Sequence, residues 1–390
     1  MFIRTPKPRS NRKKKQKRNR LFQQLEDRQL LAADGNPLIL IPGIGGSLPA
    51  DTSPEGLQAW YTTRGQAPED LALETHSQTY QSLVQSLENL GYVQGEDLFV
   101  ANWDWRLPIA PTNGANDGTI SISTAQLTNS NIRTGLEYLG NTLQDIQDAN
   151  PGEDVDIIAH GAGGLIARAY LQSSVYADEL PAVSDLVLVG TPNEGLAETL
   201  AITQDDWSGA EDLQIVSLLV DQAYQQFLSG ETITGPNGDI TDTSISRAEF
   251  VQQYVESLRH LLPTFPSIDI DGDGTLDAIN ETNTPVSGLF NDLLADLNAG
   301  ADPNAFIDNA NVTSVIFSTE TPTIDQLAQQ TGPDTTGFFS DEIRSFTEYV
   351  GSRPTEDQVW FSERHRIMVV MERCQRSLRS IRFFSILVLD

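Results

Sequence analysis

The sequence predicts an α/β fold in which helices cover both faces of a mostly parallel sheet. Short apolar strands alternate with amphipathic helices along the first half of the chain, the pattern of successive strand–helix units. A strand at 155–159 leads into a glycine-rich turn and a helix, and a second glycine-rich turn follows an earlier strand at 37–41. The chain has 390 residues, which is long enough to bury a full core.

Hydrophobic periodicity assigns the elements. Continuous runs of Val, Ile and Leu suit strands that are buried on both faces, and they occur at 37–41, 98–101, 155–159, 186–189 and 312–318. Apolar residues three and four positions apart predict helices at 80–90 and 132–149. In the first of these helices, the expected buried face consists of Leu83, Leu87 and Leu90.

Three regions of the chain differ in composition. Residues 1–34 form a basic arm followed by LFQQLEDRQLLAA, residues 35–358 form the predicted α/β domain, and residues 359–390 form an atypical basic tail. Within the domain, the polar stretch 196–310 does not alternate between strand and helix patterns. We expect this stretch to be a helical cap inserted between two strands.

The charge distribution restricts the partners of the folded domain. The formal net charge is −29, but the first 20 residues carry ten basic residues and no acid, while 21–358 holds 51 acidic residues against nine arginines. The strong negative charge of residues 21–358 disfavours nucleic acid and anionic membranes as partners. No apolar run reaches the roughly 18 residues that a membrane-spanning helix needs. The single cysteine, Cys374, excludes an intramolecular disulfide, and nothing in the sequence indicates the oligomeric state.

The N-terminal region carries a short motif. The pattern Leu25-Glu26-x-Arg28-x-Leu30-Leu31 resembles an N-terminal segment found on large exported or surface proteins of certain bacteria. This resemblance implies an exported or cell-surface protein. The alternative is a disordered basic arm that binds polyanions.

The turn after the strand at 155–159 has the spacing of a nucleophile elbow but lacks the nucleophile. In the pattern G-x-S-x-G, serine stands at the middle of a tight strand-to-helix turn. Residues 159–163 read AHGAG, so Gly161 occupies the nucleophile position and offers no side chain to attack an ester. No other G-x-S-x-G occurs, and Ser47, Ser173 and Ser174 lie outside the turn.

The glycine-rich turn PGIGGS at 42–47 predicts close approach of backbone N–H groups to a reacting carbonyl oxygen. The candidate oxyanion-hole donors are the backbone N–H groups of Ile44 and of Ala162, the residue after the elbow position. The alternative for PGIGGS is an ordinary strand-to-loop turn.

Several motifs together resemble the lecithin:cholesterol acyltransferase-like branch of the α/β-hydrolases, in particular its bacterial lipase-like members. They are LILIPGIGGS at 38–47, GYVQGEDLFVANWDWR at 91–106, VDIIAHGAGGLIARAY at 155–170, LVLVGTPNEG at 186–195 and LRHLLPTFP at 258–266. The resemblance implies an α/β-hydrolase fold and, in active relatives, Ser-His-Asp acyl transfer on an acyl lipid or ester without a cofactor. It implies a packing and hydrogen-bonding role for His160. Trp103 and Trp105 would buttress the sheet edge and line the acyl pocket, or belong simply to the core.

The acid and base that the resemblance implies are not found. In the family, the acid lies in a D-G-T-V type turn after the late strands, and the base histidine follows it. Neither follows Ser318, and the late His365 belongs to the basic tail. One hypothesis is that the tail is the acid turn translated in a shifted reading frame. Codons for residues 370–374, read in the shifted frame, permit the sequence Asp-Gly-Thr-Val. We therefore expect an acyl hydrolase or acyltransferase by descent that is inactive as written. The alternative is a non-catalytic exported protein that binds a lipid, calcium or another protein.

An aspartate-rich loop has the spacing of a calcium site. Asp269, Asp271, Asp273 and Asp277 occupy positions 1, 3, 5 and 9 of such a loop, and a glycine occupies position 6. Position 12 is Asn280, with Glu281 one residue late, so the bidentate ligand is imperfect. The loop therefore predicts either a calcium ion or a solvated acidic turn.

Overall fold

The computed structural model describes residues 35–75, 79–208, 210, 213–284, 289–299 and 305–310, and the backbones of four later strands at 312–318, 327–328, 359–361 and 367–371. The predicted export segment within 1–34 and the tail histidine His365 lie outside the described residues.

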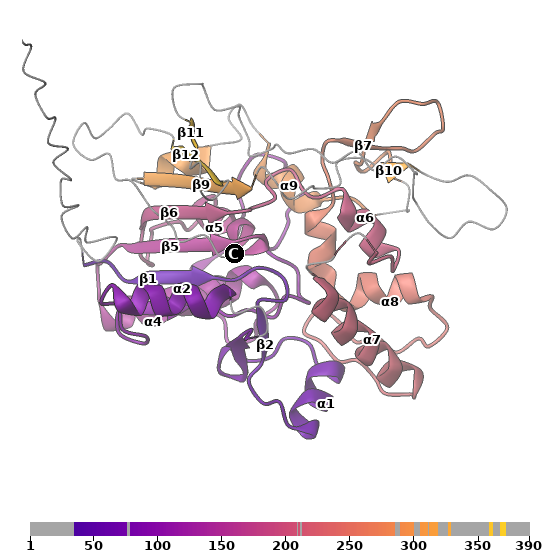
Figure 1. The fold of residues 1–390 in the computed structure, drawn as a ribbon, viewed down its shortest axis with the longest axis horizontal. Coiled ribbons are helices and arrows are strands. Elements are labelled where there is room, and N and C mark those ends of the chain that lie inside the picture. Colours follow the sequence, from indigo (N-terminus) through magenta and orange to yellow (C-terminus); the bar gives the residue numbers. More distant parts are fainter. Residues whose placement is uncertain are drawn as a thin grey trace, which may run out of the picture.

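A seven-stranded sheet forms the centre of the fold, in the order β11-β12-β9-β6-β5-β1-β4 (Figure 1). Its parallel strands are β1 (Leu38–Ile41), β4 (Leu98–Val100), β5 (Val155–His160), β6 (Val183–Val189) and β9 (Val312–Ser318). Two strands of the tail region, β12 (Ile367–Met371) and β11 (Val359–Phe361), extend the sheet antiparallel beyond β9. The predicted α/β fold class is confirmed, and β6 begins three residues earlier than expected.

The alternation of side chains along β1 divides the core between the two faces of the sheet. Leu38 and Leu40 pack in one apolar cluster with helix α2 (Thr79–Asn89). Ile39 and Ile41 pack in the other cluster, together with α4 (Gly135–Ala149) and α5 (Ala162–Leu171). Because all four side chains are fully buried, both faces of the sheet are covered, as parallel sheets require.

Both predicted helices form, but the first buries different residues and the second begins later than predicted. The expected buried face of α2 is wrong at Leu90, which follows the helix and is 46% exposed; Tyr80 and Val84 are buried beside Leu87 instead. The second predicted helix begins at Gly135 and not at 132, because the Glu137 carboxylate accepts a hydrogen bond from the Thr134 N–H (3.1 Å) and satisfies a donor at the helix start.

A long insertion separates β6 from β9, although these strands are neighbours in the sheet. Helices α6, α7 and α8 of the insertion gather beside the carboxyl ends of the parallel strands (Figure 1). The insertion contains α6 (Glu198–Thr203), α7 (Gln214–Leu228), α8 (Arg247–Tyr254), η3 (Glu256–Leu261), β7 (Pro266–Asp269), β8 (Asp277–Ala278), α9 (Asp292–Leu297) and η4 (Ala305–Asn309). It is therefore mainly helical but also includes a β-hairpin, which was not expected.

Smaller elements complete the fold. They are β2 (Ser47–Pro49), α1 (Pro54–Thr62), η1 (Pro68–Asp70), β3 (Leu71–Leu73), α3 (Thr124–Leu127) and β10 (Leu327–Ala328). Among the described helices, none combines the length and apolar character needed to cross a bilayer.

A buried ion pair joins the segment after β4 to α1 and α8. Arg106 donates two hydrogen bonds to Asp104, from Nε to Oδ1 (2.7 Å) and from Nη2 to Oδ2 (2.6 Å), and neither side chain is exposed. Its guanidinium carbon lies 3.6 Å from the centre of the Trp60 ring, and Nη1 donates to the Tyr254 hydroxyl (3.0 Å). Burial acts to raise the pKa of Asp104, but Arg106 holds that pKa below its usual value.

We predict that Asp104→Asn lowers the free energy of unfolding by about 3–5 kcal/mol, because it leaves the buried Arg106 without a counter-charge. Urea unfolding measures this loss. The matched control is Asp205→Asn, whose pair with Arg247 is partly exposed and should cost less than about 1 kcal/mol. Equal losses in the two variants would contradict a structural role specific to the buried pair.

Candidate functional site

The chain turns sharply at Gly161, between β5 and α5. Gly161 has φ 53° and ψ −126°, a conformation that residues with side chains rarely adopt. Its N–H donates to the Val189 carbonyl of the neighbouring strand (2.9 Å), and its own carbonyl accepts from the Gly164 N–H (3.0 Å). These bonds fix the bend between the sheet and the first turn of α5. The strand, sharp turn and helix that the motif predicts are therefore all present.

The space that a nucleophile side chain would occupy is open. A Cβ atom placed on Gly161 would have one neighbour within 4 Å, the Gly43 Cα at 3.7 Å, which is an ordinary van der Waals contact. A Cβ on Gly163 would instead lie 2.6 Å from the Ile41 carbonyl oxygen and 2.7 Å from that of Pro42. Gly163 is thus required for the close packing of α5 on the end of β1. At Gly161 the side chain is absent, but its space remains.

The two predicted oxyanion donors come from segments that this packing brings together. Ile44 follows Gly43, and Ala162 follows Gly161, the two glycines whose backbones approach each other. In the described part of the chain, neither the Ile44 N–H nor the Ala162 N–H donates a hydrogen bond. Ala162 begins α5, where the N–H groups lack helical acceptors and carry partial positive charge. Their role as an oxyanion hole remains a prediction.

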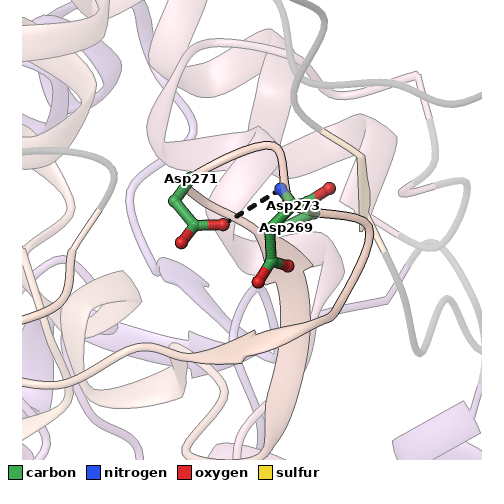
Figure 2. A group of neighbouring side chains, drawn as sticks. All are labelled: Asp269, Asp271 and Asp273. Carbon is green, nitrogen blue, oxygen red and sulfur yellow. Dashed lines mark hydrogen bonds between the residues drawn. The ribbon is translucent and has the colours of Figure 1, made fainter.

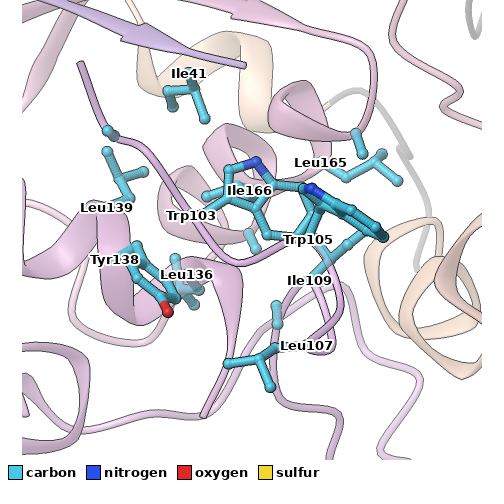
Figure 3. Close-up of a cluster of buried hydrophobic side chains, with 14 of the residues drawn as sticks. Ile41, Trp103, Trp105, Leu107, Ile109, Leu136, Tyr138, Leu139, Leu165 and Ile166 are labelled. Atoms are coloured by element: carbon cyan, nitrogen blue, oxygen red, sulfur yellow. The ribbon is translucent and has the colours of Figure 1, made fainter. Parts of the chain in front are cut away.

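Two tryptophans hold the ends of the turn at 42–47. The indole N–H of Trp103 donates to the Pro42 carbonyl (2.8 Å), and that of Trp105 donates to the Ser47 carbonyl (2.9 Å). Both rings are fully buried among side chains of α4 and α5 (Figure 3). Of the alternatives raised by the sequence, these contacts favour a buttressing and core role.

Ser47, the serine that ends the turn at 42–47, has hydrogen-bond partners in the structure. Ser47 is fully buried, and its hydroxyl donates to Asn102 Oδ1 (3.1 Å) and accepts from the Trp103 N–H (3.2 Å). Helix α7 of the insertion covers the turn, because a Cβ on Gly45 would lie 2.8 Å from Val216 Cγ2.

The two described histidines have structural partners. His160 Nδ1 lies 2.7 Å from the Tyr80 hydroxyl, in agreement with a hydrogen-bonding role. His260 Nδ1 accepts from the Ile109 N–H (3.1 Å), and Nε2 lies 3.5 Å from Asp292 Oδ1. Burial lowers the pKa of His260 to about 3, so the ring is neutral near pH 7.

The acid and base of a triad therefore stay unassigned. The other two histidines, His76 and His365, lie outside the described residues. Sequence reasoning missed the His260–Asp292 pair and the contact of Tyr80 with His160. For the His260–Asp292 pair, the only indication in the sequence was the family-like segment LRHLLPTFP at 258–266. The contact of Tyr80 with His160 depends on how α2 packs, which no sequence motif indicates.

The structure brings together three of the four predicted calcium ligands. Asp269 ends β7, and Asp271 and Asp273 lie in the loop that leads to β8, with carboxylate oxygens of all three within 4.8 Å of one another (Figure 2). The fourth, Asp277, is outside this group, and its Oδ2 accepts from the Ile270 N–H (3.0 Å). Oxygen donors at this spacing suit a hard cation, but calcium binding remains a prediction.

We predict that Gly161→Ala lowers the free energy of unfolding by about 1–3 kcal/mol, because alanine is strained at this φ and ψ although the space is open. Gly163→Ala should cost more, because backbone carbonyls must move. Chemical denaturation of both variants tests this order. A Gly161→Ala loss as large as that of Gly163→Ala would mean that the space at 161 is closed.

Calcium binding in the aspartate loop predicts a rise in Tm with millimolar calcium, because the ion relieves the repulsion among three carboxylates. Asp271→Asn should reduce the rise, whereas Asp206→Asn, outside the loop, should preserve it. Differential scanning fluorimetry and limited proteolysis measure the effect. If calcium changes neither Tm nor the rate of cleavage, the loop is a solvated turn.

Comparison with known proteins gives one family. The model of the lecithin:cholesterol acyltransferase family matches residues 67–264, just over half of the chain. No curated protein matches. Similar solved structures include the phospholipase PlaB from Legionella pneumophila, with 14% identity and a TM-score of 0.21, covering 50% of this chain and 35% of that one. Another is the product of the gene lin2722 from Listeria innocua, with 13% identity and a TM-score of 0.24, covering 73% and 84%.

This chain thus spans about a third of the length of the Legionella phospholipase, and neither TM-score is high enough to add to the argument. The family match includes the elbow, the buttressing tryptophans and most of the cap helices, which agrees with the fold described above. The chain belongs to the lecithin:cholesterol acyltransferase family and has the fold of an α/β-hydrolase of the lipase and acyltransferase type.

Proposed function

We propose that this chain is a lipase-like acyl hydrolase or acyltransferase by descent that has lost turnover, and that its elbow binds an acyl lipid or ester without cleaving it. The observation that carries the proposal is Gly161, which leaves the elbow conformation and the surrounding space intact but supplies no hydroxyl.

The loss of turnover follows from the mechanism of the family. In a Ser-His-Asp triad, the acid and base act through the serine, so loss of the nucleophile lowers turnover on the order of 10⁶-fold. Binding and oxyanion stabilisation alone retain roughly 10³-fold acceleration over water, which is too little for a useful esterase. Of the described histidines, His160 bonds to Tyr80 and His260 to Ile109, so in this proposal neither serves as the base for a serine at 161.

The retained parts of the site support binding of an acyl oxygen. The N–H groups of Ile44 and Ala162 donate no hydrogen bond to any described residue, and the N-terminus of α5 favours negative charge. Both features suit the carbonyl of an ester or the carboxylate of a fatty acid. The acidic body and the motif at 25–31 support export or display at the bacterial cell surface as part of the proposal.

The proposal predicts that neither the unmodified chain nor Gly161→Ser hydrolyses p-nitrophenyl esters above the background rate. Gly161→Ser restores the hydroxyl but not a base. Hydrolysis by this variant alone would mean that only the nucleophile is missing, whereas no hydrolysis by either protein means that the other triad groups are missing too. Absorbance at the p-nitrophenolate band measures turnover. Saturable hydrolysis by the unmodified chain would falsify the inactive assignment.

Binding is the second arm of the same experiment. The fluorescent fatty acid cis-parinaric acid should bind the unmodified chain saturably, and unlabelled oleate should displace it. The matched control is the chain unfolded in urea, which retains the composition but not the site. If no saturable signal appears, the elbow does not bind a fatty acyl carboxylate.

A further inference from the structure

One phenol links the two segments that form the elbow site. Tyr80 lies in the first turn of α2 and is 5% exposed. Its hydroxyl oxygen accepts a hydrogen bond from the Gly43 N–H (2.9 Å) and lies 2.7 Å from His160 Nδ1. Because the Gly43 N–H can only donate, the proton of the phenol is available for His160 Nδ1. Burial raises the pKa of Tyr80, so the phenol stays protonated and remains a donor near pH 7.

The backbone of the turn is shaped around this phenol. A Cβ on Gly46 would lie 2.9 Å from the Tyr80 hydroxyl oxygen, and a Cβ on Gly43 would lie 3.2 Å from His160 Nδ1. Both glycines therefore allow a close approach that a side chain would prevent. The Tyr80 and His160 rings meet edge to face, with centres 5.7 Å apart, which restricts the imidazole further.

The position of this link along the chain gives it a functional consequence. Gly43 immediately precedes Ile44, and His160 is two residues before Ala162, so the Tyr80 hydroxyl bonds to both segments that carry the candidate donors. Tyr80 itself belongs to neither segment: it lies in α2, which packs on the sheet through Val84 and Leu87.

We propose that Tyr80 is a positioning residue that sets the geometry of the Ile44 and Ala162 donors through Gly43 and His160. The proposal rests on the proposed acyl-binding function of the elbow. The ring of Tyr80 fills the core, whereas its hydroxyl determines the affinity for the acyl oxygen.

The variant that isolates the hydroxyl is Tyr80→Phe, which keeps the ring. We expect about tenfold weaker binding of cis-parinaric acid, because the variant loses the hydrogen bonds of the hydroxyl to Gly43 and His160 that position the donors. The matched control is Tyr92→Phe, which removes a second buried phenol from the same apolar cluster and should leave the affinity within about twofold. Equal affinities of Tyr80→Phe and the unmodified chain overturn the inference and leave the proposed function intact.

Variants of His160 distinguish positioning from general stability. His160→Asn keeps an acceptor close to the place of Nδ1 and should retain the affinity. His160→Leu removes this acceptor and should weaken binding, but by no more than Tyr80→Phe does, because the bond from Gly43 to Tyr80 remains. The double variant Tyr80→Phe with His160→Leu should bind cis-parinaric acid with the affinity of Tyr80→Phe alone, because both changes break the same link. Additive losses contradict the link.

A measurement without ligand keeps the inference testable if the probe does not bind. Amide hydrogen exchange in the peptide covering 40–47 should be faster in Tyr80→Phe, because the Gly43 N–H loses its acceptor, and unchanged in Tyr92→Phe. Absence of probe binding to the unmodified chain refutes the proposed function alone. Equal exchange in all three proteins refutes the positioning role of Tyr80.

Discussion

The close approach of Gly43 and Gly161 is the constraint on which the rest of the site depends. Strands β1 and β5 are parallel neighbours, so their carboxyl ends lie side by side, and the turns that follow them must share one small space. Gly163 lets the end of β1 pack against α5 without a Cβ in the way. A Cβ on Gly161 would lie 3.7 Å from the Gly43 Cα, so the two turns border the same space. In the proposed site, N–H groups from both turns serve one ligand atom there.

Three side chains from outside the turns maintain this arrangement. Trp103 and Trp105 bond to carbonyls at the two ends of the 42–47 turn, and Tyr80 bonds to an N–H within it. The buried pair of Asp104 and Arg106 follows Trp103 in sequence and joins the same segment to α1 and α8. The segment after β4 therefore supports the turn from the core side, while Val216 of α7 covers it from the cap side.

This support explains how the architecture persists without a nucleophile. A serine in the conformation of Gly161 carries backbone strain, which active elbows tolerate because the surrounding structure enforces it. Glycine adopts the same φ and ψ with little strain, so the replacement removes the reactive atom without disturbing β5, α5 or the turn at 42–47. The proposed loss of turnover is thus compatible with retention of the shape of the site.

The amino-acid pattern was enough to predict the five parallel strands, the elbow at 159–163 and the absence of a serine at its centre, because hydrophobic periodicity and glycine spacing are local properties. It did not predict β11 and β12, which pair beyond β9. Leu90 fits a helical face but lies past the end of α2, so its predicted burial was wrong. Asp277 fits the spacing of a calcium loop and accepts from the Ile270 N–H, and its part in calcium binding stays a prediction. The link from Gly43 through Tyr80 to His160 joins three distant segments, so only the tertiary structure could decide it.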